Sequence, residues 1–306
     1  MNIANNITDL IGKTPMVKIQ KLSEGLHAQI IAKLEMFNPL SSVKDRAALA
    51  MIEDAEAKGI LKKDSIIVES TSGNMGIGLA YIAAYKGYKL ILTMPDSMSN
   101  ERKNLLRALG AELELTPGIL GMKGANQKAQ EIVENNSKAL FLRQFDNRAN
   151  ANAHIKTTAQ EIWNDTDGKV DIVVIGVGSG GTVTGVGEGL KALNPNIKIV
   201  AVEPETSAVL SGEIPNIHRI QGLGAGFIPS ILNRSVIDEI IKVPNEGAYE
   251  QASLLTKCEG LFIGISSGAA FWAAKEVAKR SENKGKLIVV IFPDSGERYL
   301  SVAGLF

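Results

Sequence analysis

Cysteine is almost absent from this chain, because Cys258 is its only one among 306 residues. An intrachain disulfide is therefore excluded, and we expect a reducing compartment such as the cytoplasm. An excess of either charge is also lacking, since 33 Lys and Arg balance 33 Asp and Glu. This balance argues against nucleic acid or an anionic membrane surface as a partner, because both attract basic domains.

Long apolar runs and metal-binding patterns are missing too. Runs such as Leu287–Phe292 fall far short of the roughly 18 residues that a membrane-spanning helix needs. The N-terminal stretch MNIANNITDLIGKTP has no basic start followed by an apolar segment, so it does not indicate a signal peptide. The three histidines lack metal-ligand spacing, so no metal site is expected, and each is interpreted as a surface or packing residue.

Apolar runs and helical patterns alternate along the chain. Strands are expected at 30–34, 66–69, 89–94, 111–115, 170–177, 197–203 and 287–292. Helices are expected at 42–58, 76–86, 98–109, 122–135, 154–165, 182–193, 247–258 and 267–280. The alternation predicts an α/β fold of two domains, each a mostly parallel twisted sheet with helices on both faces. Ligands of such sheets bind beyond the carboxyl ends of the strands.

Glycine is abundant, with 30 residues, and it clusters at the predicted strand ends. The first cluster, Thr71-Ser72-Gly73-Asn74-Met75-Gly76, follows one strand and opens a helix. Backbone amides, small hydroxyls and an Asn side chain suit an anion such as a carboxylate. The same residue types also serve as helix caps, so this cluster by itself leaves both interpretations open.

The second cluster, Gly176 to Thr182, follows the most apolar strand in the chain. Its glycines allow close approach of a ligand, and successive amides cradle phosphates. The spacing also matches G-x-G-x-x-G, with Glu203 ending the next strand about 20 residues on. Phosphate binding is favoured, but the phosphate-bearing molecule stays open, and an NAD-dependent dehydrogenase is one alternative.

Three further features are ambiguous. The cluster Gly222–Gly226 is typical of a hinge, a ligand-facing loop or a plain surface loop. Ser266 precedes a helix, where it either caps the helix or reaches a ring nitrogen of a ligand. Lys44 lies at a helix start, whose positive field and desolvation would lower its pKa and favour a neutral amine able to form a Schiff base.

Six motifs occur in order: FNPLSSVKDR at 37–46, TSGNMG at 71–76, GVGSGGT at 176–182, GLGAGFIP at 222–229, GISSGAA at 264–270 and PDSGERYLS at 293–301. With them the chain resembles the cysteine synthases (O-acetylserine sulfhydrylases), which are fold-type II pyridoxal-phosphate enzymes with a tryptophan synthase β-like fold. Cystathionine β-synthases share these motifs. The likeness covers nearly the whole chain.

The resemblance implies a role for each motif. Lys44 would hold pyridoxal 5'-phosphate and act as the catalytic base at the substrate α-carbon. Asn74 would contact the cofactor's ring oxygen, and Ser266 its pyridine nitrogen. The cofactor phosphate would be bound by Gly178, Ser179, Gly180, Gly181 and Thr182. The substrate would be bound by Thr71, Ser72, Met75, Gln144 and Gly222, with its carboxylate held by Thr71, Ser72 and Gln144.

The resemblance also implies an organisation and partners. A small mobile domain at 39–145 would close on a large cofactor domain formed by 1–38 and 146–306. Family members are usually homodimers, and some bind the C-terminal tail of a serine acetyltransferase. The implied reaction is β-replacement on a β-substituted L-alanine through an α-aminoacrylate, with a small amino acid and sulfide or a thiol as reactants.

Two departures from the family pattern leave the substrate open. Met75 replaces the second Thr of TSGNTG, and Asn233 replaces a common Asp. The first hypothesis is O-acetyl-L-serine plus sulfide giving L-cysteine and acetate. The second, suggested by Met75, is a cysteine-consuming enzyme that releases sulfide and forms lanthionine, cystathionine or serine.

Overall fold

The structure is a computed structural model that describes residues 3–71 and 73–306, so the predicted substrate residue Ser72 lies outside the described residues. The chain divides into two compact units. Unit 1 comprises Lys44–Asn150 and the described part of Met1–Ile11, and unit 2 comprises Gly12–Val43 and Ala151–Phe306. Every helix in the described ranges is too short or too polar to cross a membrane.

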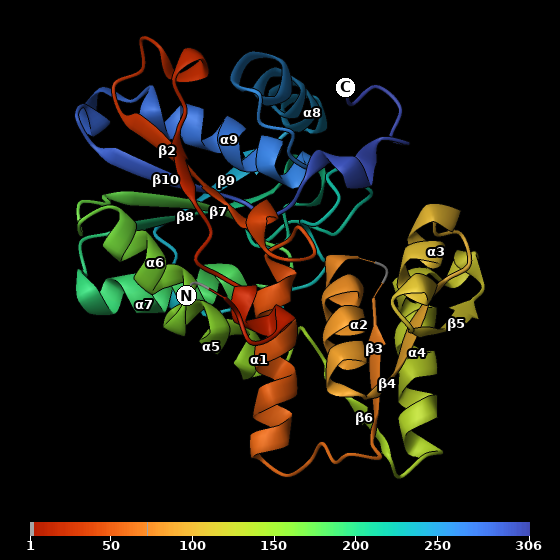
Figure 1. Ribbon diagram of the computed structural model, residues 1–306. Helices are drawn as coiled ribbons and strands as arrows, with labels where there is room; N and C mark the ends of the chain where they lie inside the picture. Colours follow the sequence, from red (N-terminus) through yellow and green to blue (C-terminus); the bar gives the residue numbers. More distant parts are fainter. Residues whose placement is uncertain (1–2, 72) are drawn as a thin grey trace. The chain divides into compact units, whose positions relative to one another are not determined.

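Unit 1 contains a four-stranded parallel sheet with the strand order β5-β4-β3-β6. In chain order its main elements are α1 (Lys44–Ala57), β3 (Ile66–Ser70), α2 (Asn74–Lys86), β4 (Lys89–Pro95), α3 (Asn100–Ala108), β5 (Glu112–Thr116), α4 (Gly121–Glu134) and β6 (Ala139–Phe141). Helix α2 packs between α1 and the sheet, whereas α4 packs on β3 and β4, and Figure 1 shows β3 between α2 and α4.

Unit 2 contains a six-stranded sheet in the order β1-β2-β10-β7-β8-β9, parallel except for the β1–β2 pair. Its strands are β1 (Met16–Lys18), β2 (Gln29–Leu34), β7 (Ile172–Gly176), β8 (Lys198–Pro204), β9 (Glu239–Val243) and β10 (Leu287–Phe292). Its main helices are α6 (Thr158–Asp165), α7 (Gly181–Leu193), α8 (Asn245–Leu254) and α9 (Ile265–Ala278), and α5 (Arg148–Lys156) begins in unit 1.

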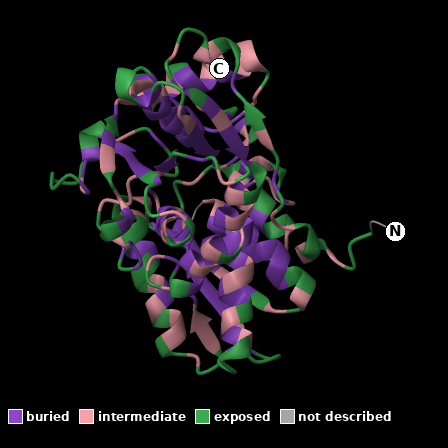
Figure 2. Cartoon of the chain, turned by 90° about the vertical axis from the view of Figure 1, so that its left-hand side faces the viewer, coloured by how far each residue is buried: buried purple, intermediate pink, exposed green. Residues whose placement is uncertain are grey.

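The core of unit 2 lies on both faces of its sheet, which explains the unbroken apolar strands. Ile172 and Val174 of β7 belong to one apolar cluster, whereas Val173 and Ile175 belong to another. Successive side chains of a strand point to opposite faces, so both faces of β7 are covered. Burying each such side chain contributes about 1.5–3 kcal/mol. Figure 2 shows these strands in the colour of buried residues.

The α/β class with two mostly parallel sheets is confirmed, and the element boundaries differ in a few places. The single helix expected at 154–165 is two helices, α5 and α6, because the backbone at Thr157 leaves the helical region with φ −121° and ψ −73°. The helix expected at 247–258 ends as α8 at Leu254 and continues as a π-helical turn, Leu255–Glu259. Cys258 in this turn is half-buried.

Candidate active site

In unit 2, the loop between β7 and α7 forms a cradle of backbone groups. A Cβ atom at position 178 would lie 2.4 Å from the carbonyl oxygen of Gly222, so only glycine fits there. Gly180 is the N-cap of α7, with φ +84°, and as a glycine it supplies no capping side chain. The first amides of α7 are therefore open to an anion, which the positive end of the helix favours.

A second loop of unit 2 brings a hydroxyl next to this cradle. Ser266 lies in the first turn of α9 and is only 2% exposed. A Cβ atom at Gly222 would lie 3.4 Å from Ser266 Oγ, and Gly222 itself meets the backbone near Gly178. The structure thus brings together three of the sequence motifs, at 176–182, 222–229 and 264–270. A phosphate cradle beside a buried neutral hydroxyl fits a phosphorylated pyridine ring.

His154 supports the same loop and was not predicted as a site residue. Its ring is 1% exposed, with Nδ1 2.8 Å from Thr158 Oγ1 and Nε2 3.3 Å from Thr182 Oγ1. The imidazole therefore orients the hydroxyl of Thr182, a predicted phosphate ligand. The sequence signal was weak, because His154 lies 28 residues before Thr182 and carries no motif of its own.

The segment after β10 holds two other segments of unit 2, one at Val43 and one at Gly264. The N–H of Val43, the residue before Lys44, donates to Pro293 O at 2.8 Å. The N–H of Gly264, two residues before Ser266, donates to Asp294 O at 3.1 Å. The buried Asp294 also accepts the hydroxyl of Tyr299 at 2.5 Å. The PDSGERYLS motif thus has a structural role that sequence reasoning did not assign.

In unit 1, Lys44 begins α1 as predicted, and it is half-buried. Helix α1 lies against α2, where a Cβ atom at Gly78 would be 3.2 Å from Lys44 O. This close packing fixes the first turn of α1 beside the helix that carries Asn74 and Met75. Lys44 and the described residues of the TSGNMG motif thus belong to one compact unit.

The start of α2 is a second helix end whose N-cap is a glycine. Asn74 and Met75 are its first two residues, and the N-cap Gly73 makes no side-chain capping bond. Thr71 is 5% exposed, and its Oγ1 accepts the N–H of Gly73 at 3.1 Å. The geometry suits a carboxylate. Met75 is 1% exposed, so its side chain fills the interior instead of adding a donor at the helix end.

Gln144 follows β6, and Glu69, near the end of β3, lies close to it, although the sequence did not indicate Glu69 as a site residue. The backbone N–H groups of Gln144, Ser70 and Arg143 lower the pKa of the buried Glu69 carboxyl group, but the effect of burial is larger. Arg143 has φ +56°, a left-handed conformation uncommon for a side chain of this size. Glu69 is 1% exposed, and burial raises its pKa to about 8. Its place two residues before Thr71 was the only sequence signal for Glu69.

The raised pKa of Glu69 predicts a pH-dependent stability. The folded state holds this proton up to about pH 8, whereas an unfolded Glu releases it near 4.5. The stabilisation is therefore complete below pH 4.5 and is lost as pH rises toward 8. Each tenfold change in proton affinity corresponds to about 1.4 kcal/mol, so we expect a loss of a few kcal/mol.

Urea unfolding at several pH values measures this effect. Glu69→Gln keeps the shape of the neutral acid and does not titrate, so the difference in unfolding free energy between the two proteins isolates Glu69. The wild type should lose stability relative to Glu69→Gln as pH rises from about 5 to 8. Parallel curves for the two proteins would contradict the expectation.

The dehydrogenase alternative loses its support at Glu203. This carboxylate is 2% exposed and accepts the N–H of Leu210 at 2.7 Å and both the N–H and the hydroxyl of Ser211. It is therefore engaged within the chain, whereas a ribose-binding Glu must reach a ligand.

The structure also explains the Asn at position 233, because its side chain donates to Glu188 at 2.8 Å and accepts from Ser235. An Asp at 233 would lose the first of these bonds.

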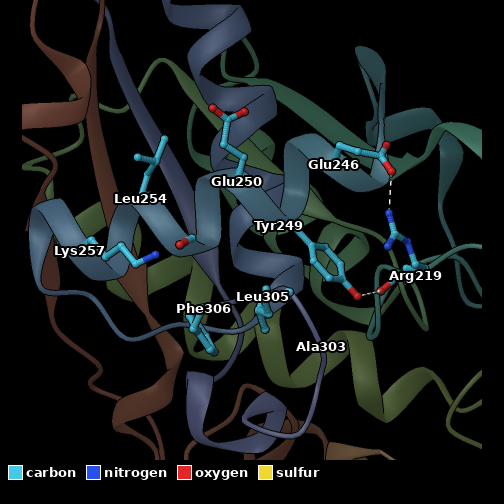
Figure 3. Close-up of a pocket in the computed structure, with 11 residues that line it drawn as sticks. Arg219, Glu246, Tyr249, Glu250, Leu254, Lys257, Ala303, Leu305 and Phe306 are labelled. Carbon is cyan, nitrogen blue, oxygen red and sulfur yellow. Dashed lines mark hydrogen bonds and ion pairs between the residues drawn. The ribbon is translucent and has the colours of Figure 1, made fainter.

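A separate hollow of about 520 Å³ lies in unit 2 and contains none of the predicted site residues. Figure 3 shows Tyr249 in it beside Arg219, which pairs with Glu246 at 2.6 Å. The pocket is lined by Arg219, Glu246, Tyr249, Glu250, Ser253, Leu254, Lys257 and residues 303–306. Its charges of both signs are exposed and are not arranged around a buried polar group.

Comparisons with known proteins identify the family to which the chain belongs. The family described as "Pyridoxal-phosphate dependent enzyme" matches residues 7–294. A cysteine synthase of Staphylococcus aureus (strain Mu50) is 53% identical over 298 residues, 97% of this chain and 96% of that protein. The crystal structure of a cysteine synthase (OASS) from Entamoeba histolytica has a TM-score of 0.97 and 47% identity, covering 99% of this chain and 91% of that chain. A hydrogen sulfide-producing enzyme from Fusobacterium nucleatum has a TM-score of 0.93 and 46% identity, covering 97% of this chain and all of that one.

Proposed function

The chain belongs to the cysteine synthase family of pyridoxal-phosphate dependent enzymes, and we propose that it converts O-acetyl-L-serine and sulfide into L-cysteine and acetate. It is an enzyme, and its cofactor is pyridoxal 5'-phosphate. The observation that supports the proposal best is the meeting of the loops at 178, 222 and 266 in unit 2. This arrangement offers a phosphate cradle and a neutral partner for a pyridine nitrogen.

We assign the cofactor contacts to residues at the start of α7, to Ser266 and to Asn74. The amides at the start of α7 and the hydroxyl of Thr182 would hold the phosphate, and His154 would keep that hydroxyl in position. Ser266 would donate to or accept from the ring nitrogen without a charge, and Asn74 would contact the ring oxygen. When bound, the cofactor withdraws electrons from the substrate's α-carbon, which lets the β-substituent leave.

The chain's own residues then have distinct tasks. The amine of Lys44 would bind the cofactor's aldehyde and later remove and return the proton at the substrate α-carbon. The hydroxyl of Thr71, the amides at the start of α2 and the side chain of Gln144 would orient the α-carboxylate. Ser72, which belongs to the same motif, would add a further hydroxyl. Together they hold the α-proton within reach of one base.

Three further proposals follow from the family. The domain at 39–145 would close on the domain formed by 1–38 and 146–306 when substrate binds, which would exclude water from the reacting carbon. Two copies would form a homodimer, and the C-terminal tail of a serine acetyltransferase is a further candidate partner. The single cysteine is compatible with work in the cytoplasm.

The second hypothesis, a reaction that consumes cysteine, is based on Met75. The relatives include cysteine synthases and one hydrogen sulfide-producing enzyme, and the cysteine synthases favour the first reaction. Sulfide release from cysteine alone, compared with cysteine formation from O-acetylserine and sulfide, separates the two. Brisk cysteine formation with little sulfide release is expected, whereas the reverse result would overturn the proposal.

Met75→Thr is expected to raise kcat/KM for O-acetylserine relative to cysteine by about tenfold. The reason is that a hydroxyl at the first turn of α2 adds a donor for the substrate carboxylate, and such a bond to a charged group contributes about 1.5–3 kcal/mol. Met75→Leu is the matched control, because it changes the shape without adding a donor. Equal substrate ratios in all three proteins would show that position 75 does not set the preference.

A further inference from the structure

Tyr299 and Asp294 form a buried polar pair in unit 2 that the proposed reaction does not use. Tyr299 ends the helical turn Gly296–Tyr299, and Asp294 lies two residues after β10. The two residues are 3% and 1% exposed, and the Tyr299 hydroxyl donates to Asp294 Oδ2 at 2.5 Å. A short hydrogen bond to a carboxylate, away from water, is among the stronger ones in a protein. It therefore fixes the Asp294 side chain in one orientation.

Both members of the pair pack directly on Gly264. A Cβ atom at Gly264 would overlap Asp294 Oδ1 and would lie 2.6 Å from Tyr299 Cε2, so every side chain is excluded there. The backbone N–H of Gly264 also donates to Asp294 O at 3.1 Å. Beside this bond, the N–H of Gly296 donates to Phe262 O at 3.0 Å. The segment that carries the pair thus sets the position of Gly264.

Gly264 is the residue from which the helix of Ser266 begins. It is the N-cap of α9, and its carbonyl oxygen accepts the N–H groups of Ser267 and Gly268 at 3.1 and 3.3 Å. Ser266 follows in the first turn and is 2% exposed, and its Oγ would lie 3.4 Å from a Cβ atom at Gly222. The direction of a side chain in a helix follows from the backbone, so a shift of Gly264 would redirect the Ser266 hydroxyl.

We propose that Tyr299, acting through Asp294, is a positioning residue for Ser266 and directs its hydroxyl to the pyridine nitrogen of the cofactor. The inference rests on the proposed function, because that function assigns Ser266 to the ring nitrogen. The strength of a hydrogen bond falls steeply when its angle departs from a straight line. The buried pair therefore affects how tightly, and in which orientation, the cofactor ring is held.

The place of the pair also explains why an acid is tolerated in the interior. Asp294 lies against the N-cap of α9, where the helix dipole favours a negative charge. The hydroxyl of Tyr299 replaces part of the hydration that burial removes from the carboxylate. Asp294 can thus accept from Tyr299 and press on Gly264 at a lower cost of burial than an isolated acid would have.

A double-mutant cycle tests whether Tyr299 acts through Ser266. The four holoenzymes are the wild type, Tyr299→Phe, Ser266→Ala and the double variant. Each is diluted in steps, and the absorbance of the retained pyridoxal phosphate gives its dissociation constant. Visible circular dichroism of the same samples reports whether the ring keeps one orientation. Tyr249→Phe is the matched control, because it removes a hydroxyl of the same unit that lies 3.4 Å from Arg219 O.

The expected results follow from the order of the contacts. Ser266→Ala should raise the dissociation constant about tenfold and Tyr299→Phe about fivefold, because the Ser266 hydroxyl is lost in the first and misplaced in the second. In the Ser266→Ala background, Tyr299→Phe should add less than about twofold, because no hydroxyl remains to be positioned. The visible circular dichroism should decrease in all three variants of the cycle, whereas Tyr249→Phe should match the wild type in both measurements.

The proposal is overturned if Tyr299→Phe has the same effect in both backgrounds, which would make Tyr299 a general support of the fold. An unchanged dissociation constant in Ser266→Ala would also overturn it. Should Tyr299→Phe not fold, Asp294→Asn enters the same cycle, because it keeps the shape of the side chain and weakens the acceptor of the Tyr299 hydroxyl. Its effect should likewise disappear in the Ser266→Ala background. Failure of the proposed function is distinct, because the wild type would then hold the cofactor and form no cysteine.

Discussion

Lys44→Ala is expected to lower kcat/KM for cysteine formation by about 10³-fold or more. The lysine would serve both as the covalent anchor of the cofactor and as the base at the substrate α-carbon, so its loss removes two functions at once. Lys44 lies in the first turn of α1, which packs against α2 at Gly78. The backbone that carries the amine therefore has a fixed position. Rates are measured with O-acetylserine and sulfide in cofactor-saturated enzyme.

A covalent readout separates the anchor from the base. Borohydride should fix the cofactor to the wild-type chain, so that it survives denaturation, and it should not fix it to Lys44→Ala. Lys58→Ala is the matched control, since Lys58 follows the same helix and is exposed, with an ion pair to Asp54 at 2.6 Å. Such exposed pairs contribute little. A Lys44→Ala enzyme that keeps wild-type turnover or covalent labelling would refute the assignment.

The features predicted best from the sequence are those set by local patterning. The apolar run that became β10 matches the expected limits, Leu287 and Phe292, because a strand covered on both faces has no polar positions to blur its ends. The glycine loop before α7 was likewise identified, since a tight turn against another backbone excludes every side chain at Gly178. Both features leave their signal within a few consecutive residues.

What the sequence did not reveal depends on partners far apart in the chain. Strands β1, β6 and β9 were not predicted, because their short or mixed segments gain their pairing only from neighbours such as β2, β3 and β8. His154 and Glu69 were missed for the same reason. Each is a single polar residue influenced by a residue from another part of the chain: His154 contacts Thr182, and the backbone of Gln144 lowers the pKa of Glu69. Neither leaves a periodic pattern or a motif.

Gly178→Ala is expected to weaken the binding of pyridoxal phosphate about 100-fold. The added methyl group would meet Gly222 O at 2.4 Å, and a backbone carbonyl cannot rotate aside as a side chain does. The loop at 178 or the loop at 222 must shift, and the amides at the start of α7 would then lose their alignment toward the phosphate. Losing one hydrogen bond to a charged group costs about 1.5–3 kcal/mol, which corresponds to the expected change.

Titration of the cofactor-free proteins, followed by absorbance, measures this affinity, and thermal unfolding of the same samples measures stability. Gly285→Ala is the control, because Gly285 lies in unit 2 with φ +79° and open space where a Cβ atom would lie, so an alanine there would carry backbone strain of about 1–2 kcal/mol without a clash. This control should unfold at a lower temperature and still bind the cofactor normally. Gly178→Ala should lose affinity well beyond any change in its unfolding temperature. The clash at position 178 is with Gly222, which also lies beside Ser266. An unchanged affinity would therefore mean that the loops at 178 and 222 do not form the cofactor site.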